Sequence, residues 1–419
     1  MDGTLKDRIR RILFTQHGYL FEKGAFNKEE SQQQIKTIIE GILNRPRRDL
    51  GVEEKEAMVM ELLDDVVGLG PLEKLLRDPD ITEIMINGFQ KVFVEKRGKK
   101  ELLDMSFESN EQLMCIIYRM LEGTRKHVDE ANPYTEVALE GGTRVNIIIP
   151  PLAADGPAIT IRKFLKEFSR VEDFVNVSTM DARMAEFLVG SIKAKVNIIF
   201  SGATGSGKTT TVNVLSSYIN NRERIVTIED TAELHLSQDH VVRLEAKGPS
   251  IEGKGEISLR QLFINSLRMR PDRIILGEVR GVEAVDMLQA MCSGHRGGLA
   301  VIHASSPSDV IHRLETMMLI SGLGMSLEAI YRQISSAINL IIQHEQLLDG
   351  SRKITHITQT NGIRDGQIVL EDLFVYDIDS VEKESEVRGR WKATGIIPVF
   401  AQAFKNRGVS LSADLFRKD

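Results

Sequence analysis

Cysteine is nearly missing from this sequence, and its scarcity excludes two kinds of stabilising cross-link. Cys115 and Cys292 are the only cysteines among 419 residues, and they lie far apart in the chain. Such usage argues against a disulfide framework and against a four-cysteine zinc site. We therefore expect no structural zinc and a reducing compartment.

Long apolar runs are missing as well. No stretch of about 18 apolar residues occurs, so the sequence predicts no membrane-spanning helix. The basic residues between Lys6 and Arg11 are followed only by Ile12, Leu13 and Phe14 before polar residues return, which is too little for a secretory signal. We expect a cytoplasmic protein, free or docked on a partner.

The sequence also has neither a strong net charge nor many aromatic residues. The formal net charge is −6, with 27% charged residues of both signs, and aromatic residues make up 5%. Non-specific nucleic-acid binding depends on a basic surface, and single strands also need aromatic side chains for stacking. We therefore expect no nucleic-acid partner. With 42% hydrophobic residues, the chain can form two or three domains.

The clearest feature that is present is a phosphate-binding loop. The stretch 196–213, VNIIFSGATGSGKTTTVN, is predicted to be an apolar strand (196–200), a glycine-rich turn and a helix that opens at the lysine. It fits the pattern G-x-x-x-x-G-K-[ST]. The residues that we expect to bind the nucleotide are Gly202, Ala203, Thr204, Gly205, Ser206, Gly207, Lys208, Thr209 and Thr210.

Each residue type in this loop has a physical role. Glycines allow backbone angles at which successive N–H groups point inward and form an anion site, to which the following helix adds the positive end of its dipole. Lys208 can reach the terminal phosphates of ATP, and the Thr209 hydroxyl can ligate a bridging Mg²⁺. A chance glycine turn is the alternative, and the flanking strand and helix argue against it.

Three further apolar segments alternate with helical stretches after the loop. They are 224–230, 273–279 and 299–305, and they read as buried parallel strands of an α/β domain. Ligands bind at the carboxyl ends of such strands. These ends carry Glu229, Glu278 and His303.

Hydrolysis of ATP needs a carboxylate that orients water and a metal that neutralises phosphate charge. Glu278 stands where phosphate-loop proteins hold this carboxylate, although an aspartate is usual there and Gly277 precedes it. Glu229 could provide a second carboxylate, and His303 could donate to the γ-phosphate. The alternatives are solvated strand ends for both glutamates and a structural role for the histidine.

Periodicity divides the chain into four parts. Residues 1–75 read as a helical segment, 76–164 as an α+β domain, 165–178 as a polar and irregular linker, and 179–419 as the ATPase domain with a carboxyl-terminal extension. Local signals predict a helix capped by Asn110, a helix capped by Ser178 or Thr179 that buries Met184, Phe187, Leu188 and Ile192, and an acidic loop from Asp377 to Glu386.

From about residue 60 onward, the sequence resembles the secretion ATPases of the type II/IV superfamily, and most closely the CpaF-like assembly ATPases of tight-adherence (Flp) pili. Four segments carry the resemblance in order: GATGSGKT (202–209) for the Walker A loop, TIEDTAELHL (227–236) for the Asp box, LRMRPDRIILGEVRG (267–281) for Walker B and SGHRGGLAVIHASSP (293–307) for the His box. The four-cysteine zinc motif of the type II secretion and pilus extension branch is absent. This favours the tight-adherence or type IV secretion branch.

The resemblance implies a RecA-like ATPase that forms a homo-oligomeric ring, usually a hexamer, with ATP and Mg²⁺ between its amino- and carboxyl-terminal domains. It implies that Glu278 is the catalytic carboxylate and a metal ligand with Thr209, that Glu229 supports the water or the metal, and that His303 faces the γ-phosphate. Arg144 and Arg162 match positions from which the amino-terminal domain supplies arginines to the nucleotide; surface or strand pairing is their alternative.

The expected function is an ATP-hydrolysing motor that powers pilus assembly or protein secretion. It would act on platform proteins of the inner membrane and be held there peripherally through them. Two alternatives stay open at this point: a type IV secretion or conjugation ATPase, and a nucleotide-gated scaffold with little turnover.

Overall fold

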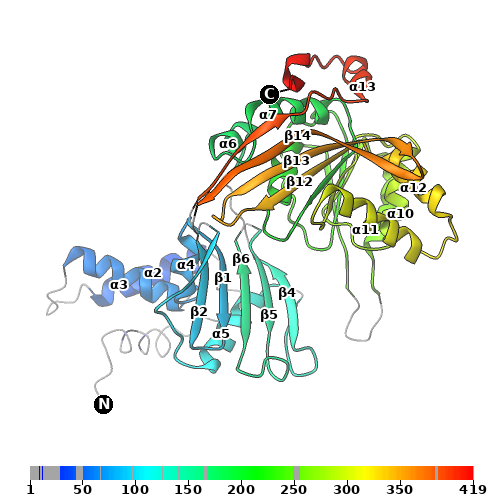
Figure 1. Cartoon of the computed structure of the whole chain (residues 1–419). Helices are drawn as coiled ribbons and strands as arrows, with labels where there is room; N and C mark the ends of the chain where they lie inside the picture. Colours follow the sequence, from blue (N-terminus) through cyan, green and yellow to red (C-terminus); the bar gives the residue numbers. More distant parts are fainter. Residues whose placement is uncertain are drawn as a thin grey trace. The chain divides into compact units, whose positions relative to one another are not determined.

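The chain divides into two compact units, Met1–Leu165 and Lys166–Asp419. The computed structural model describes residues 9, 12, 29–43, 51–66, 68–96, 98–124, 126–139, 142–163, 168–248, 255–382 and 386–418. Each unit has its own β-sheet (Figure 1). Among these residues, every helix is too short or too polar to cross a membrane.

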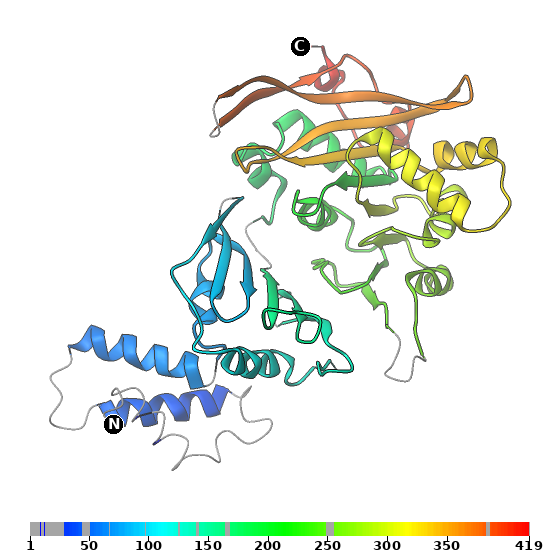
Figure 2. The ribbon, with the colours of Figure 1, turned by 60° about the horizontal axis from the view of Figure 1, so that its bottom comes forward.

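The first unit begins with helices. They are α2 (Glu29–Leu43), α3 (Val52–Val66) and α4 (Leu72–Arg77). Helices α2 and α3 lie side by side (Figure 2) and share a small apolar cluster that includes Ile35, Ile39 and Leu62. The rest of the predicted helical segment, apart from Ile9 and Ile12, lies mainly outside the described residues.

A six-stranded antiparallel sheet forms the body of the first unit, in the order β3-β2-β1-β6-β5-β4. The strands are β1 (Ile81–Asn87), β2 (Lys91–Lys96), β3 (Lys99–Leu102), β4 (Tyr134–Ala138), β5 (Arg144–Ile148) and β6 (Ala158–Arg162). Alternate apolar residues of these strands pack against helix α5 (Asn110–Leu121) in one core. The helix cap predicted at Asn110 is wrong: the Ser109 hydroxyl accepts the Gln112 N–H, while the Asn110 side chain accepts from Phe89 N.

The second unit is built on a nine-stranded sheet in the order β15-β14-β13-β12-β7-β11-β10-β8-β9. Its parallel strands are β7 (Ile198–Gly202), β8 (Ile225–Glu229), β9 (Val241–Glu245), β10 (Arg273–Leu276), β11 (Leu299–Ile302) and β12 (Leu340–Gln346). Strands β13 (Arg352–Arg364), β14 (Gln367–Glu382) and β15 (Glu386–Ala393) continue the sheet antiparallel. One strand, β11, separates the phosphate-loop strand β7 from the acid-bearing strand β10. The predicted α/β class is confirmed.

Helices cover both faces of this sheet (Figure 1). They are α6 (Val171–Asn176), α7 (Ala182–Lys193), α8 (Lys208–Ser216), α13 (Ala401–Asn406) and the 3₁₀ turn Ala413–Phe416 on one face, and α9 (Leu259–Ser266), α10 (Glu283–Cys292), α11 (Pro307–Ile320) and α12 (Leu327–Ala337) on the other. A second 3₁₀ turn, Leu267–Met269, follows α9. Strand β7 is buried on both faces, because Ile198 and Phe200 enter one core and Ile199 the other.

Helix α7 buries the four apolar residues that were predicted for it, but its cap differs. Asp181, not Ser178 or Thr179, accepts the N–H of Met184 and begins the helix. Ser178 has a φ of 55°, so it lies in the left-handed region and joins α6 to α7 instead.

Two other expectations about local structure are wrong. The stretch predicted to be an irregular linker contains helix α6, because Val171 and Phe174 reach the apolar core although their neighbours are polar. The stretch predicted to be an acidic loop lies mostly in β14 and at the start of β15, with residues 383–385 outside the described ranges. Basic residues of β15 pair with these acids, as Arg390 does with Asp379 at 3.9 Å, so the charges do not prevent a strand.

Candidate functional site

The predicted phosphate-binding loop joins β7 to α8. Gly202, Gly205 and Gly207 have φ values of 146°, 80° and 99°, which side-chain-bearing residues rarely adopt. At Gly202 space is short too, because a Cβ there would lie 2.3 Å from the His344 carbonyl oxygen. Helix α8 begins at Lys208, so its first N–H groups open into the loop.

Lys208 is folded onto its own loop. Its side chain is buried, and Nζ donates to the Ala203 carbonyl oxygen at 2.6 Å. The Ser206 hydroxyl donates to the same oxygen at 2.8 Å. Thr209 and Thr210 are half-buried in the first turn of the helix, whereas Ala203 and Thr204 are exposed at the tip of the loop. The loop therefore gathers a cation, hydroxyls and backbone donors, which is the chemistry that binds a phosphate chain.

Glu278 and His303 lie next to one another at the carboxyl ends of β10 and β11. The distance from His303 Nε2 to Glu278 Oε1 is 3.8 Å, and each side chain is 35% exposed. Strand β11 is the neighbour of the phosphate-loop strand β7, so His303 stands on the strand between the acid and the loop. A partly exposed carboxylate with an adjacent imidazole can orient a water molecule and bind the proton that it loses.

Glu229 has a different environment from Glu278. It is buried at the end of β8, and its Oε2 accepts the N–H groups of Glu233 and Leu234 at 2.8 and 2.9 Å. Within the part of the chain that the structure describes, Oε1 has no hydrogen-bond partner. Burial raises the pKa of this carboxyl above its usual value, although the two N–H donors act against the rise. One oxygen thus holds the loop after β8, and the other is an unpaired acceptor suited to a water or a metal ligand.

Arg144 and Arg162 belong to the first unit, where they occupy directly opposite positions on β5 and β6. Arg144 lies 3.4 Å from Glu136, and Arg162 lies 3.8 Å from Glu83. Like charges on opposite positions of antiparallel strands repel each other. The two arginines thus lie side by side on neighbouring strands of the first unit.

Two residues near the phosphate loop were not predicted from the sequence, and both come from strands far along the chain. Arg352, the first residue of β13, donates from Nε to the Gly205 carbonyl oxygen at 2.8 Å. His344 on β12 is buried beside Gly202, its partner in the parallel pairing of β12 with β7. Burial, together with the nearby charge of Lys208, lowers the pKa of His344 to about 3. No local pattern marks either residue, because their place depends on how the strands pair.

The protein offers only a few ligands for Mg²⁺ near the loop, which fits a metal ion that is bound mostly by the phosphates of a nucleotide. In the described ranges, no group of three or more His, Cys, Asp or Glu side chains could hold a metal ion by itself. Mg²⁺ at nucleotide sites usually takes one or two protein ligands and completes its shell with phosphate oxygens and water. The Thr209 hydroxyl and Glu278 would provide such ligands.

Comparison with known proteins relates the chain to secretion proteins. The family model described as "Type II/IV secretion system protein" matches residues 65–394. A putative conjugal transfer protein of Mycobacterium tuberculosis is 30% identical over 314 residues, which cover 74% of this chain and 89% of that protein. Protein VirB11 of Agrobacterium tumefaciens is 33% identical over 304 residues, covering 65% and 88%. The crystal structure of the VirB11 ATPase of Brucella suis is 27% identical, with a TM-score of 0.38 and coverage of 69% and 95%.

Proposed function

This chain belongs to the type II/IV secretion system protein family and is an ATPase, and from that premise we propose that it is a ring-forming motor that drives assembly of a tight-adherence pilus. The observation that carries the hydrolytic part of the proposal is the pairing of Glu278 with His303 at 3.8 Å, one strand away from a complete phosphate-binding loop. The pilus part rests on the sequence resemblance to tight-adherence assembly ATPases. A scaffold that only binds nucleotide has no need of this pair. The motor would act peripherally at the inner membrane, as a hexamer bound to platform proteins.

In the proposed reaction, Lys208 and the amide groups of the loop bind the β- and γ-phosphates. Thr209 and Glu278 would hold Mg²⁺, which would supply positive charge to the leaving phosphates. Glu278 orients the attacking water and accepts its proton as the bond between the γ-phosphorus and the bridging oxygen breaks, which yields ADP and phosphate. His303 donates to the γ-phosphate, and Glu229 steadies the water or the metal shell through its unpaired oxygen.

Arg144 and Arg162 have a role in this proposal as well. We infer that they supply positive charge to the phosphates of a bound nucleotide, from the same chain or from a neighbouring one in the ring. Their direct opposition on β5 and β6 supports this role, since an anion bound by both would relieve their repulsion. Contacts made only while the γ-phosphate is present would tie hydrolysis to movement.

A type IV secretion or conjugation ATPase is the second candidate. It is favoured by relatives such as the putative conjugal transfer protein and VirB11, whose match covers most of their length. The net charge of −6 argues against a motor that binds DNA directly. Deletion of the gene separates the two: loss of surface pili with normal substrate transfer supports the pilus, and the reverse supports conjugation.

Catalysis is tested with purified protein and two variants. Lys208→Ala should lose binding of a fluorescent ATP analogue and all turnover. Glu278→Gln should keep binding but lose turnover by about 100-fold or more, as expected for removal of a catalytic base. Robust hydrolysis by Glu278→Gln contradicts the assignment of the carboxylate, and a wild-type protein that binds ATP without turnover supports the scaffold.

A further inference from the structure

Arg352 reaches the phosphate-binding loop from the antiparallel part of the sheet. It lies 147 positions from Gly205 in sequence, yet its Nε donates to the Gly205 carbonyl oxygen at 2.8 Å. The arginine is half-buried, and its Cδ would lie 3.7 Å from a Cβ on Gly207. The side chain thus lies against the turn that contains both glycines.

Strand pairing explains why this arginine arrives at the loop. Strand β12 pairs parallel with β7, so that His344 is level with Gly202 at the point where the loop begins. Strand β13 returns antiparallel to β12, with Arg352 opposite Gln346, just beyond His344. The strand order β13-β12-β7 therefore delivers the first residue of β13 to the loop that follows β7.

The residues after Arg352 hold this end of β13 in place. Lys353 is buried, its Nζ donates to the Ser178 carbonyl oxygen at 2.5 Å, and it lies 5.5 Å from the centre of the Trp391 ring. The next amide, Ile354 N, donates to the Thr179 carbonyl oxygen at 2.8 Å. Arg352 is consequently presented from a fixed strand end rather than from a free loop.

The hydrogen bond from Arg352 is made to Gly205, a residue of the loop with open space beside its Cα. A phosphate-binding loop works when its N–H groups face inward, which turns some of its carbonyls outward. Gly205 has a φ of 80°, and a Cβ there would meet no atom within 4 Å, so the space beside its Cα is open. The hydrogen bond from Arg352 to the Gly205 carbonyl restrains the peptide against rotating in this space.

We propose that Arg352 is a positioning residue for ATP: it holds the Gly205 carbonyl outward, and so keeps the loop in its phosphate-binding form before the nucleotide arrives. The inference deepens the proposed ATPase function and rests on it. It assigns to the antiparallel strands, which carry none of the four boxes of the resemblance, a direct part in nucleotide affinity.

The test is a comparison of Arg352→Ala with Arg364→Ala, an exposed arginine near the other end of the same strand. Loss of a charged hydrogen bond is worth about 1.5–3 kcal/mol, which sets the rise in the Kd and KM for ATP at roughly 10- to 150-fold if the whole energy preorganises the loop. We expect kcat to change less than about threefold, and Arg352→Lys, which keeps the charge but not the planar donor, to recover only part of the affinity. Arg364→Ala should match wild type.

Hydrogen exchange gives a second measurement, which would not change in this local way if Arg352 only stabilised the fold. Amides 204–207 of nucleotide-free Arg352→Ala should exchange faster than in wild type, with the melting temperature little changed, and saturating ATP should restore their protection. Wild-type affinity together with unchanged exchange overturns the proposal, as does an equal loss of kcat and melting temperature without a rise in KM. If Arg352→Ala does not fold, Arg352→Lys carries the same comparison. ATP affinity is measured by binding. The role of Arg352 can therefore be tested even if the wild-type protein does not hydrolyse ATP.

Discussion

Glu229 and Gly277 lie against each other at the carboxyl ends of the neighbouring strands β8 and β10, so closely that a Cβ on residue 277 would lie 2.8 Å from Cγ of Glu229. This relationship explains a departure in the sequence. Most phosphate-loop enzymes have an aspartate near this strand end, whereas here a glycine precedes the single acid Glu278. The glycine provides the space in which the Glu229 side chain is buried.

Gly277→Ala should therefore disturb Glu229 before it disturbs Glu278. The methyl group cannot enter unless Glu229 moves away from the Glu233 and Leu234 amides, and overpacking of this kind costs about 1–3 kcal/mol of unfolding free energy. Urea unfolding measures the loss. In Glu229→Ala, where the obstructing atoms are gone, the same change at 277 should cost much less, so the double mutant should be far from additive. Additive losses would show that the two residues are independent.

The sequence predicted those parts of the site that local patterns encode. The loop 202–210 has a spacing that its chemistry requires, and Glu278 and His303 follow short apolar strands, so their position at one edge of the sheet could be foreseen. Arg352 could not be foreseen, since its contact depends on the pairing of β12 with β7 across about 140 residues. Helix α6 was hidden for a related reason. Only two of its six residues, Val171 and Phe174, are buried, which is too short a pattern to show a period.

His344 makes the stability of the second unit depend on pH. Its ring is buried, neither nitrogen has a hydrogen-bond partner among the described residues, and its pKa is lowered to about 3 by burial and by the Lys208 charge. A histidine in the unfolded chain has a pKa near 6.5. Below this pH the unfolded state therefore binds a proton that the folded state does not bind. Stability is thus unaffected above pH 6.5 and falls as the pH drops toward 3.

The predicted size follows from about 1.36 kcal/mol per pH unit over the roughly 1.5 units between pH 6.5 and 5. Wild type should lose about 2 kcal/mol more than His344→Leu between pH 7.5 and 5, as measured by urea unfolding at both pH values. All other titrating groups are shared by the two proteins, so their effects cancel in the difference. Equal losses would mean that the histidine is accessible to protons in the folded protein.

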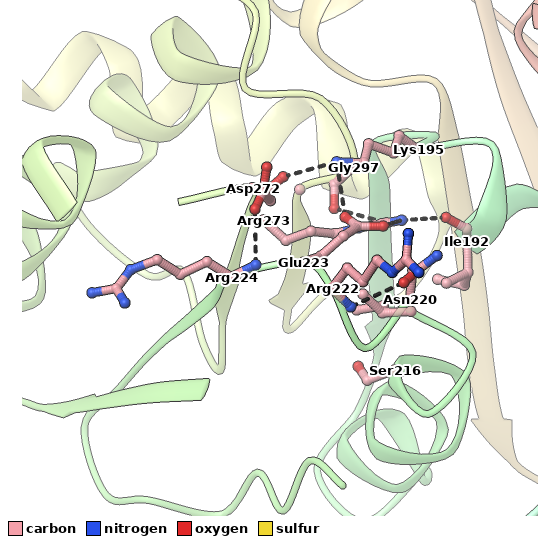
Figure 3. A network of polar contacts seen from close by, with 12 residues as sticks. Ile192, Lys195, Ser216, Asn220, Arg222, Glu223, Arg224, Asp272, Arg273 and Gly297 are labelled. Atoms are coloured by element: carbon pink, nitrogen blue, oxygen red, sulfur yellow. Dashed lines mark hydrogen bonds and ion pairs between the residues drawn. The ribbon is translucent and has the colours of Figure 1, made fainter. Parts of the chain in front are cut away.

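A buried ion network at the opposite end of β10 gives a prediction about stability alone (Figure 3). Arg273 is fully buried and donates to Glu223 at 2.8 Å and to the Ile192 carbonyl oxygen at 2.6 Å, and Lys195 lies 2.8 Å from the same carboxylate. Burial opposes the charge on Glu223, but the hydrogen bond and the charge of Arg273 outweigh it and lower the pKa of Glu223. The pair is therefore ionised at neutral pH.

Glu223→Gln should destabilise the protein by about 3–5 kcal/mol, because it leaves the buried guanidinium without a counter-charge. Arg273→Met should cost less, since Lys195 still pairs with Glu223. The double variant should be more stable than Glu223→Gln alone. Thermal unfolding ranks the three variants, and the KM for ATP should stay at the wild-type value in all that fold, because this network lies at the amino end of β10 and the carboxylate of the site follows its carboxyl end.

Arg144 and Arg162 allow a test in which function and stability are expected to separate. If they serve a bound phosphate chain, Arg144→Ala and Arg162→Ala should each lower kcat/KM for ATP by about 10- to 150-fold, the size expected when a charged contact of about 1.5–3 kcal/mol is lost. Their unfolding free energy should change by less than about 1 kcal/mol, because the ion pairs with Glu136 and Glu83 are long and partly exposed, and because removing one arginine also removes repulsion. Lys100→Ala, an exposed charge on the edge strand β3 of the same sheet, is the matched control and should leave both quantities unchanged. A loss of stability that parallels the loss of turnover would assign the two arginines to strand pairing instead.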